Sequence, residues 1–329
     1  MTTSPPPHHR PGGGFRNPWV SHAVPGFGSV LKWLLVHRTT RPRPKDPDPS
    51  VFVRARPAFA VPRASASALT VTWVGHASLL VQLAGLNILT DPMWSQRASP
   101  VQFSGPRRWV PPGIAFADLP PIDIVLQSHN HYDHLDDDTL RRLAWDHPGA
   151  AWAVPLGLAQ FVRKRGVRNE AVTELDWWQE HDLGAIRVVC TPAQHFSARS
   201  FRDRGATLWC GWSLAAQSGK RVFFAGDTGY HPEFAQIAER CGPFDLALMP
   251  IGAYEPRWFM RYLHMNPEEA VAAFRALGAR AMVPIHWGTF KLTDEAMDEP
   301  PVRARAAWLA AGLPIEAYRQ LVHGETITL

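Results

Sequence analysis

The residues with the clearest chemical potential stand together at positions 127–137, Q-S-H-N-H-Y-D-H-L-D-D, directly after an apolar run. This stretch holds three histidines and three aspartates in eleven positions. A buried strand does not need such groups, and a solvated loop has little use for histidine. Neutral imidazole and carboxylate are good ligands for zinc and similar ions. The stretch therefore predicts a metal-binding loop at the end of a strand, with a polar loop of chance histidines as the alternative.

Further candidate ligands, His195, Asp227 and His286, each follow another apolar run of strand character. Sites collect at the carboxyl ends of strands, where loops vary on a rigid frame. Taken singly, His195 has the alternative of a core histidine and Asp227 that of a turn residue. The full candidate set is His129, His131, Asp133, His134, His195, Asp227 and His286. So many ligands exceed the needs of one tetrahedral ion but suit two ions that share a bridging carboxylate.

Short strands and helices must position these residues. We expect strands within 69–92, 121–128, 150–155, 185–192, 220–229, 245–252 and 279–288. We expect helices at 136–147, 156–166, 266–278 and 300–312. The third of these helices begins with an Asn266 cap followed by Pro267, and it stops at Gly278. Because strands and helices alternate in both halves, the pattern predicts one α/β layered domain of about 260 residues.

Residues 1–62 differ from the rest of the chain. They contain 12 of the 31 prolines and the run Gly12-Gly13-Gly14, with one short helix expected near 29–36. We therefore expect 1–62 to form a basic, Pro/Gly-rich arm that is largely disordered or membrane-proximal. Residues 63–329 are expected to form the catalytic domain.

The net charge is unevenly distributed, because residues 1–45 carry seven basic residues and no acid. The remainder, 46–329, sums to −2. A basic segment suits nucleic acid or an anionic membrane, but the near-neutral body argues against nucleic acid. A solvated tail without a role is the alternative reading of the arm.

Two features bear on the compartment. The three cysteines, Cys190, Cys210 and Cys241, show no close pairing, which argues against a disulfide framework and fits a reducing environment. The apolar run Val30–Val36 is too short to span a bilayer and is a poor signal sequence. We expect a cytoplasmic protein, with peripheral contact on the inner face of the membrane as a hypothesis.

Several long motifs carry a resemblance to a known family: T-W-V-G-H-A-S, L-T-D-P-M-W-S-Q-R-A-S-P, S-H-N-H-Y-D-H-L-D, E-L-D-W-W-Q-E, F-F-A-G-D-T-G-Y, G-A-Y-E-P-R-W-F-M and I-H-W-G-T-F. The chain resembles the N-acylphosphatidylethanolamine-hydrolysing phospholipase D family of the metallo-β-lactamase superfamily. The resemblance runs from about Leu69 to the C-terminus. It implies an αββα four-layer sandwich with a dinuclear zinc site between the edges of two sheets.

The resemblance also implies a role for each site residue. His129, His131, His195 and Asp227 are similar to the ligands of the first zinc ion. Asp133, His134, Asp227 and His286 are similar to those of the second, with Asp227 as the bridge. Asp91 resembles a buried carboxylate that orients a ligand histidine, with a turn residue as the alternative. His76 is a candidate for the cavity wall or, equally, a satisfied core histidine.

The implied reaction is hydrolysis of the phosphodiester of an N-acylated ethanolamine phospholipid to phosphatidic acid and an N-acylethanolamine. Asp133 and Asp227 are the expected catalytic carboxylates. The segment G-A-Y-E-P-R-W-F-M-R-Y-L-H-M, with Tyr254, Arg257, Trp258 and Phe259, is the expected substrate contact, because an arginine beside an apolar lip suits a phosphate head with acyl chains. A loop packed on its own aromatic rings is the alternative.

Other functions stay open at this point. A sugar-phosphate lactonase or a nuclease would use the same scaffold and metal centre, because function lives in the grafted pocket. A non-catalytic module that binds metal or lipid is a further alternative, which the complete ligand set disfavours. The expected partners are a phospholipid substrate and an anionic membrane surface, without nucleic acid, and a homodimer is one open oligomeric state.

Overall fold

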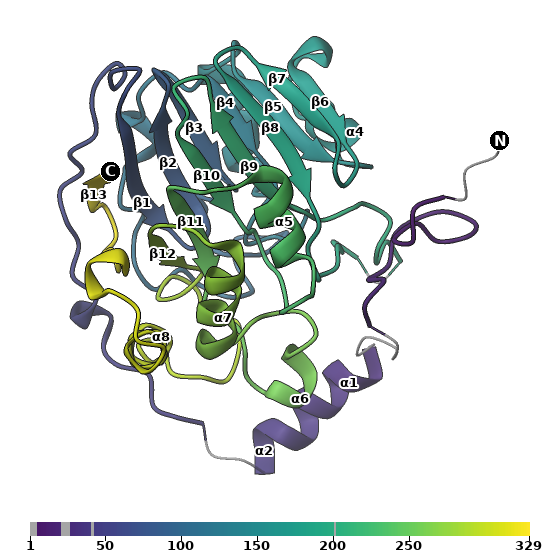
Figure 1. Ribbon diagram of the computed structural model, residues 1–329. Coiled ribbons are helices and arrows are strands. Elements are labelled where there is room, and N and C mark those ends of the chain that lie inside the picture. The colour runs from purple at the N-terminus through teal and green to yellow at the C-terminus, as the bar shows by residue number, and fades with distance from the viewer. Residues whose placement is uncertain (1–4, 21–26, 41–42, 201) are drawn as a thin grey trace.

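Two β-sheets lie face to face in the computed structural model, which describes residues 5–20, 27–40, 43–200 and 202–329 (Figure 1). The seven-stranded sheet has the order β13 (Thr326–Thr328), β1 (Leu69–Gly75), β2 (Ser78–Leu83), β3 (Leu86–Thr90), β4 (Ile124–Leu126), β5 (Ala151–Pro155) and β6 (Val172–Leu175). The six-stranded sheet has the order β12 (Met282–Ile285), β11 (Leu246–Pro250), β10 (Arg221–Phe224), β9 (Gly211–Ala216), β8 (Ile186–Thr191) and β7 (Glu180–Leu183).

Side-chain alternation shows that both faces of the seven-stranded sheet are covered. On β2, Leu79 and Val81 join the core between the sheets, whereas Leu80 packs into a second core under the outer helices. On β4, Ile124 and Leu126 face the first core and Val125 the second. Successive side chains on a strand point to opposite faces, so a sheet buried on both sides has continuous apolar strands.

The helices form the outer layers of the sandwich. Their bounds are α3 (Asp137–Asp146), α4 (Ala159–Arg163), α5 (Phe234–Cys241), α6 (Arg257–Met260), α7 (Pro267–Leu277) and α8 (Glu299–Ala310), with short 3-10 turns at 49–51, 116–118, 169–171 and 315–317. Helices α3 and α4 pack on the second core, and α5, α7 and α8 pack on the six-stranded sheet (Figure 1). The predicted αββα four-layer sandwich is confirmed.

The predicted caps of α7 are also confirmed. Asn266 accepts the Glu269 backbone N–H at 2.8 Å, Glu269 accepts the Asn266 N–H at 3.0 Å, and Gly278 takes φ +60° beyond the last turn. The sequence analysis missed the strands β6, β7, β9 and β13 and the helices α5 and α6. All of them are short, and a short run of residues does not distinguish the helical from the strand period.

The N-terminal residues that the structure describes lie against the domain. A tight hairpin forms at residues 8–16, closed by a bridge between His9 and Phe15, and the Phe15 side chain is buried. A second segment contains α1 (Phe27–Lys32), a π-helical turn at 33–37 and α2 (Arg38–Thr40), and it runs beside α6 (Figure 1). These described residues are ordered by contacts with partners distant in sequence, and the expectation of an arm that is largely disordered or membrane-proximal stays a prediction. A boundary at residue 62 stays a prediction.

Two further sequence-based expectations concern the whole chain. The three cysteines are buried and unbonded to one another, as their spacing predicts. Among the described residues, no helix has the length and hydropathy that a membrane crossing requires.

One buried histidine links the N-terminal residues to the six-stranded layer. The ring of His231 stacks between Trp19 (centroids 4.8 Å apart) and Phe234 (4.2 Å), and neither ring nitrogen has a hydrogen-bond partner in the described structure. Burial lowers the pKa of His231 to about 3.

We predict that His231→Phe makes folding less sensitive to acid. The unfolded chain binds a proton at His231 below pH 6.5, whereas the folded chain does not until about pH 3, so the native residue costs stability as the pH falls. When the pH falls from 7 to 5, the free energy of unfolding should decrease by roughly 2 kcal/mol less in the variant than in the parent protein. Urea unfolding at both values measures this difference.

His181→Phe provides the control for the same replacement at an exposed position. An equal loss of stability for His231→Phe and the parent protein would contradict the prediction.

Candidate metal centre

Loops from both sheets converge at one edge of the sandwich. The loop after β4 supplies the residues between His129 and His134, and the segments after β8, β10 and β12 supply His195, Asp227 and His286. All these side chains are buried or nearly so. The structure thus brings the seven predicted ligands together, although their role as ligands stays a prediction.

Three histidines form one half of the centre. His131 Nδ1 lies 2.9 Å from His129 Nε2 and 3.1 Å from His195 Nε2. Burial, with the neighbouring histidines, lowers the pKa of His131 to about 3 and that of His129 well below its usual value. Burial also lowers the pKa of His195 to about 4. Neutral imidazoles whose nitrogens face one another are the form in which histidine binds a metal ion.

The second half of the centre is richer in charge. Asp133 Oδ2 lies 3.4 Å from His134 Nε2 and 3.5 Å from His286 Nε2, and the two histidine nitrogens are 3.2 Å apart. Burial opposes charge here, but the two carboxylates beside these rings dominate. They raise the pKa of His286 to about 9 and that of His134 well above its usual value.

Asp227 lies between the two halves. Its Oδ2 is 3.1 Å from His134 Nε2 and 3.7 Å from His195 Nε2, and its Oδ1 is 3.2 Å from His286 Nε2. Burial alone would raise the pKa of Asp227, but His134 and His286 hold it well below the usual range. A carboxylate that reaches ligand nitrogens of both groups has the position that a bridge requires.

The donor set fits metal ions. Three of the closest contacts join two ring nitrogens, at 2.9, 3.1 and 3.2 Å, and His131 Nδ1, which takes part in two of them, can donate only one hydrogen bond. A cation at the centre of each group would satisfy these nitrogens. Imidazole and carboxylate ligands in two adjoining groups suit two ions of the zinc class.

Asp91 holds parts of both halves from the end of β3. Its Oδ2 accepts from His134 Nδ1 at 2.6 Å and from the Ser128 hydroxyl at 2.5 Å, and its Oδ1 accepts the Ser128 backbone N–H at 2.6 Å. The Ser128 oxygen can then accept from His129 Nδ1, 2.8 Å away. With Nδ1 protonated on both rings, the Nε2 lone pairs point into the centre. This geometry supports the predicted orienting role of Asp91.

His76 supports the other carboxylate. Its Nε2 lies 2.8 Å from Asp133 Oδ2, and its ring is 1 % exposed, so it belongs to the buried wall behind the centre. His76 (φ +57°), Asp91 (φ +34°) and His286 (φ +62°) all adopt the left-handed region. Residues other than glycine are rare there, and such strain is concentrated at functional sites.

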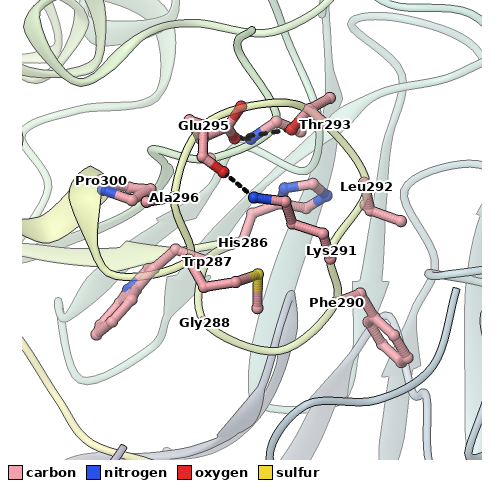
Figure 2. A pocket seen from close by; sticks show the side chains of 13 residues that line it. His286, Trp287, Gly288, Phe290, Lys291, Leu292, Thr293, Glu295, Ala296 and Pro300 are labelled. Atoms are coloured by element: carbon pink, nitrogen blue, oxygen red, sulfur yellow. Dashed lines mark hydrogen bonds between the residues drawn. The ribbon is translucent and has the colours of Figure 1, made fainter. Parts of the chain in front are cut away.

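A small cavity of about 20 Å³ lies behind His286 (Figure 2). His286 Nδ1 borders it and has no hydrogen-bond partner among the described residues. Lys291 also lines this cavity, and its ammonium group donates to the Glu295 carbonyl and to Asp46 (2.7 Å). A polar cavity of this size holds one water molecule, which would complete the hydrogen bonding of His286.

The predicted substrate contacts of Tyr254 and Arg257 stay predictions, but both polar groups have partners within the protein. Tyr254 is fully buried, and its hydroxyl donates to Glu299 Oε1 at 2.7 Å. The Arg257 guanidinium binds both oxygens of Glu269, at 2.9 and 2.8 Å, and donates to the His264 carbonyl. These groups are bonded to partners 7 to 45 residues away, which the local sequence pattern does not reveal.

The aromatic pair of the same segment is packed against the N-terminal helical segment. Phe259 is 6 % exposed, and its ring centroid is 5.6 Å from that of Trp33. Trp258 is partly exposed, with Lys32 Nζ 5.6 Å from its ring centroid. The alternative of a loop packed on aromatic rings therefore describes Phe259 better than a substrate contact does, while Trp258 retains exposed surface.

The sequence analysis missed His264. This residue is 9 % exposed, and its Nδ1 lies 3.9 Å from Asp227 Oδ2 and forms no hydrogen bond in the described structure. Its ring lies 4.9 Å from that of His195. His264 follows a short helical turn instead of a strand, so the rule that ligands follow strands passed over it. It is the one additional buried imidazole at the centre that the described residues show beside the bridging carboxylate.

Comparison with known proteins agrees with this geometry. Residues 86–287 match the model of the beta-lactamase superfamily domain, and the chain belongs to this family. It is 44 % identical to N-acyl-phosphatidylethanolamine-hydrolyzing phospholipase D 1 of Caenorhabditis elegans over 72 % of this chain and 68 % of that protein. The mitochondrial enzyme of that name in Saccharomyces cerevisiae is 37 % identical over 70 % of this chain and 49 % of its own length.

Solved structures show the same fold. Igni18, a metallo hydrolase from Ignicoccus hospitalis, superposes with a TM-score of 0.60 at 22 % identity, covering 80 % of this chain and 98 % of that one. A possible metal-dependent hydrolase from Veillonella parvula gives 0.62 at 16 % identity, with 80 % and 100 % coverage. Together with the family match, the ligand geometry supports a metal-dependent hydrolase.

We predict that Asp91→Asn weakens metal binding in both halves of the centre. The amide keeps the size of the side chain but loses the charge that holds His134 and Ser128 in place. Loss of such supporting partners typically lowers metal affinity 10–100-fold. Zinc retained after dialysis against a weak chelator, measured by elemental analysis, tests this prediction.

Asp182→Asn, on the exposed strand β7, is the control for the same chemical change. If Asp91→Asn retains zinc as well as the control does, Asp91 does not orient the ligands.

Proposed function

We propose that the protein is a zinc-dependent phospholipase of D type, which hydrolyses N-acylphosphatidylethanolamine to phosphatidic acid and an N-acylethanolamine. One observation carries the proposal: all seven candidate ligands converge, with Asp227 between the two groups, in a chain 44 % identical to an enzyme named for this reaction. Two zinc ions per chain are the corresponding cofactors.

Bound there, two zinc ions would lower the pKa of a shared water and counter the charge that develops on the phosphoryl oxygens. The chain supplies the geometry. Asp133, fixed by His76 at 2.8 Å, lies against His134 and His286, where its carboxylate can accept a hydrogen bond from a water and orient it. Burial would raise the pKa of Asp133, but His134 and its other partners hold it well below the usual range, so it is ionised at neutral pH.

His264 is the residue best placed to contact the substrate beside Asp227. Burial holds its pKa well below the usual value, so the imidazole is neutral. A neutral imidazole can donate one hydrogen bond to a phosphoryl oxygen without adding a charge. The Arg257 side chain holds this segment from behind, through its bond to the His264 carbonyl at 3.0 Å.

The proposed substrate lies in a bilayer, so the enzyme must reach a membrane surface. The N-terminal helical segment beside α6 is suited to this contact, because Leu35 is 61 % and Val36 49 % exposed, with Lys32 also exposed. A short apolar insertion with basic neighbours binds an anionic interface without spanning it. We propose peripheral attachment of a cytoplasmic enzyme through this segment. Arg41, another basic residue of the predicted N-terminal arm, lies outside the described residues.

We predict that zinc-loaded protein in water enriched with oxygen-18 converts N-acylphosphatidylethanolamine to labelled phosphatidic acid and unlabelled N-acylethanolamine. Water adds its oxygen to phosphorus, the phosphorus–oxygen bond to the ethanolamine breaks, and the leaving oxygen takes a proton. Mass spectrometry of both products tests the reaction. Phosphatidylcholine, bis-p-nitrophenyl phosphate, a sugar lactone and single-stranded DNA are assayed in parallel.

Asp227→Asn should abolish turnover because it weakens the link between both halves, and Asp182→Asn should not. Diacylglycerol or a lysolipid as the main product would mean that another bond is cleaved. Hydrolysis of the lactone or DNA alone would favour a lactonase or a nuclease, and metal binding without any turnover would favour a non-catalytic module.

We predict that the double variant Leu35→Gln with Val36→Gln binds anionic phosphatidylglycerol vesicles about tenfold more weakly, which corresponds to roughly 1.4 kcal/mol of lost apolar insertion. Co-sedimentation at low salt measures this binding. The variant should keep its activity on substrate dispersed in detergent.

Val302→Gln with Leu309→Gln is the matched control, since these apolar residues of α8 are 68 % and 54 % exposed. Equal vesicle affinity of the two double variants would refute membrane docking by the helical segment.

A further inference from the structure

Residues 6–19, here called the N-terminal strap, contact the domain through hydrogen bonds and stacked rings. The strap begins as the hairpin closed between His9 and Phe15, and its tip is the glycine run 12–14. The Phe15 N–H donates to the Gly205 carbonyl at 2.7 Å. A Cβ atom on Gly14 would lie 2.6 Å from that carbonyl oxygen, so the two backbones approach as closely as glycine allows.

Two histidines fasten the start of the strap to the domain. His8 Nε2 lies 2.6 Å from Asp176 Oδ1, and His9 Nε2 lies 2.8 Å from Asp176 Oδ2. His8 is only 4 % exposed and stacks on Trp177 with ring centroids 4.2 Å apart. One carboxylate thus receives both imidazoles, and the strap gains a hydrogen-bonded clasp beside an apolar contact.

Aromatic rings fasten its other end. Trp19 lies nearly parallel to Trp177, with an interplanar angle of 7° and centroids 5.4 Å apart, and its other face covers His231. Stacked aromatic pairs contribute about 0.5–1.5 kcal/mol each beyond the area they bury. The strap is therefore held at both ends, and the residues between its ends have fixed positions.

Asn17 occupies this fixed middle and contacts a predicted metal ligand. Its side-chain Nδ2 donates to the backbone carbonyl of His195 at 2.8 Å, and Asn17 is 9 % exposed. On the opposite side of the same residue, His195 Nδ1 lies 2.9 Å from the Leu263 carbonyl. His195 stands in a loop four residues beyond the end of β8, so these two bonds fix its main chain and its ring.

We propose that Asn17 is a positioning residue of the metal centre and that the strap, locked by its histidine clasp, keeps His195 in place for the first ion. The segment that composition marks as a tail is then a working part of the site. The inference rests on the metal centre and not on the choice of substrate. The inference predicts different effects on the two proposed ions, because Asn17 bonds to His195 and not to Asp133 or His286.

The test uses zinc release from the loaded full-length protein, without substrate. Asn17→Asp keeps the size of the side chain but places an acceptor against the His195 carbonyl. We expect one of the two zinc ions to be lost to a colorimetric chelator about tenfold more readily, in the range found for residues that support metal ligands. The other ion should be released as in the parent protein. Asn169→Asp, at an exposed asparagine, is the matched control.

A second variant, His8→Ala with His9→Ala, opens the clasp without changing Asn17. Trypsin should then cut faster after Arg16, which is exposed and precedes the buried Asn17, and the same ion should be released more readily. His181→Ala is the control for loss of an exposed histidine. Release of both ions at the parent rate, or an equal increase for both ions, would overturn the proposal, since the second result is that of general destabilisation.

Discussion

The centre depends on a buried carboxylate in a strained backbone position. Asp91 has no exposed surface, and burial raises its pKa, so it stays useful as an acceptor only because it receives hydrogen bonds from His134 and Ser128. Through the Ser128 oxygen the same carboxylate reaches His129. One side chain thereby sets the ring orientation in both halves of the centre. Without this partner an imidazole could rotate, and its lone pair would then point away from the proposed ion. The left-handed conformation of Asp91 places it under these rings, and the β-sheet around it holds that conformation.

The two halves differ in charge because the carboxylates of Asp133 and Asp227 lie closest to the histidines of the second half. The three histidines of the first half are neutral at physiological pH because burial lowers their pKa. In the second half, Asp133 and Asp227 lie against His134 and His286 and raise the pKa of both rings. In the protein alone, the carboxylates favour protonation of these rings. A cation in the second half would take over this balance and displace protons, whereas a cation in the first half would bind with little change in protonation. Metal binding should therefore release protons mainly from His134 and His286.

The sequence predicts the scaffold of the centre well and its surroundings poorly, for a physical reason. His129, His195 and His286 follow buried strands, and strand ends are readable from apolar runs, so the convergence of the ligands could be expected. The partners of the predicted substrate-contact segment could not be expected. The Arg257 guanidinium pairs with Glu269 on α7, and a pattern of neighbouring residues does not show which distant group binds a guanidinium. His264 was missed because it follows a helical turn. The N-terminal residues were expected to be disordered because proline and glycine are common in linkers, yet long-range contacts order those that the structure describes.

The residues that the sequence analysis did not place correctly lie around the metal centre and outside the sheets. The ligands come from strand ends inside the matched family domain, but the residues that bracket His195 come from outside its core elements: Asn17 from the N-terminal strap and the Leu263 carbonyl from the loop before α7. The same loop carries His264 to the bridging carboxylate, and the helical segment with Trp33 packs on the residues just before it. The layered domain thus supplies the predicted ligands, while the N-terminal strap and the loop before α7 contact His195 from outside its core elements. Chains that share the ligands can still act on different substrates, because segments outside the sheets can change without disturbing them.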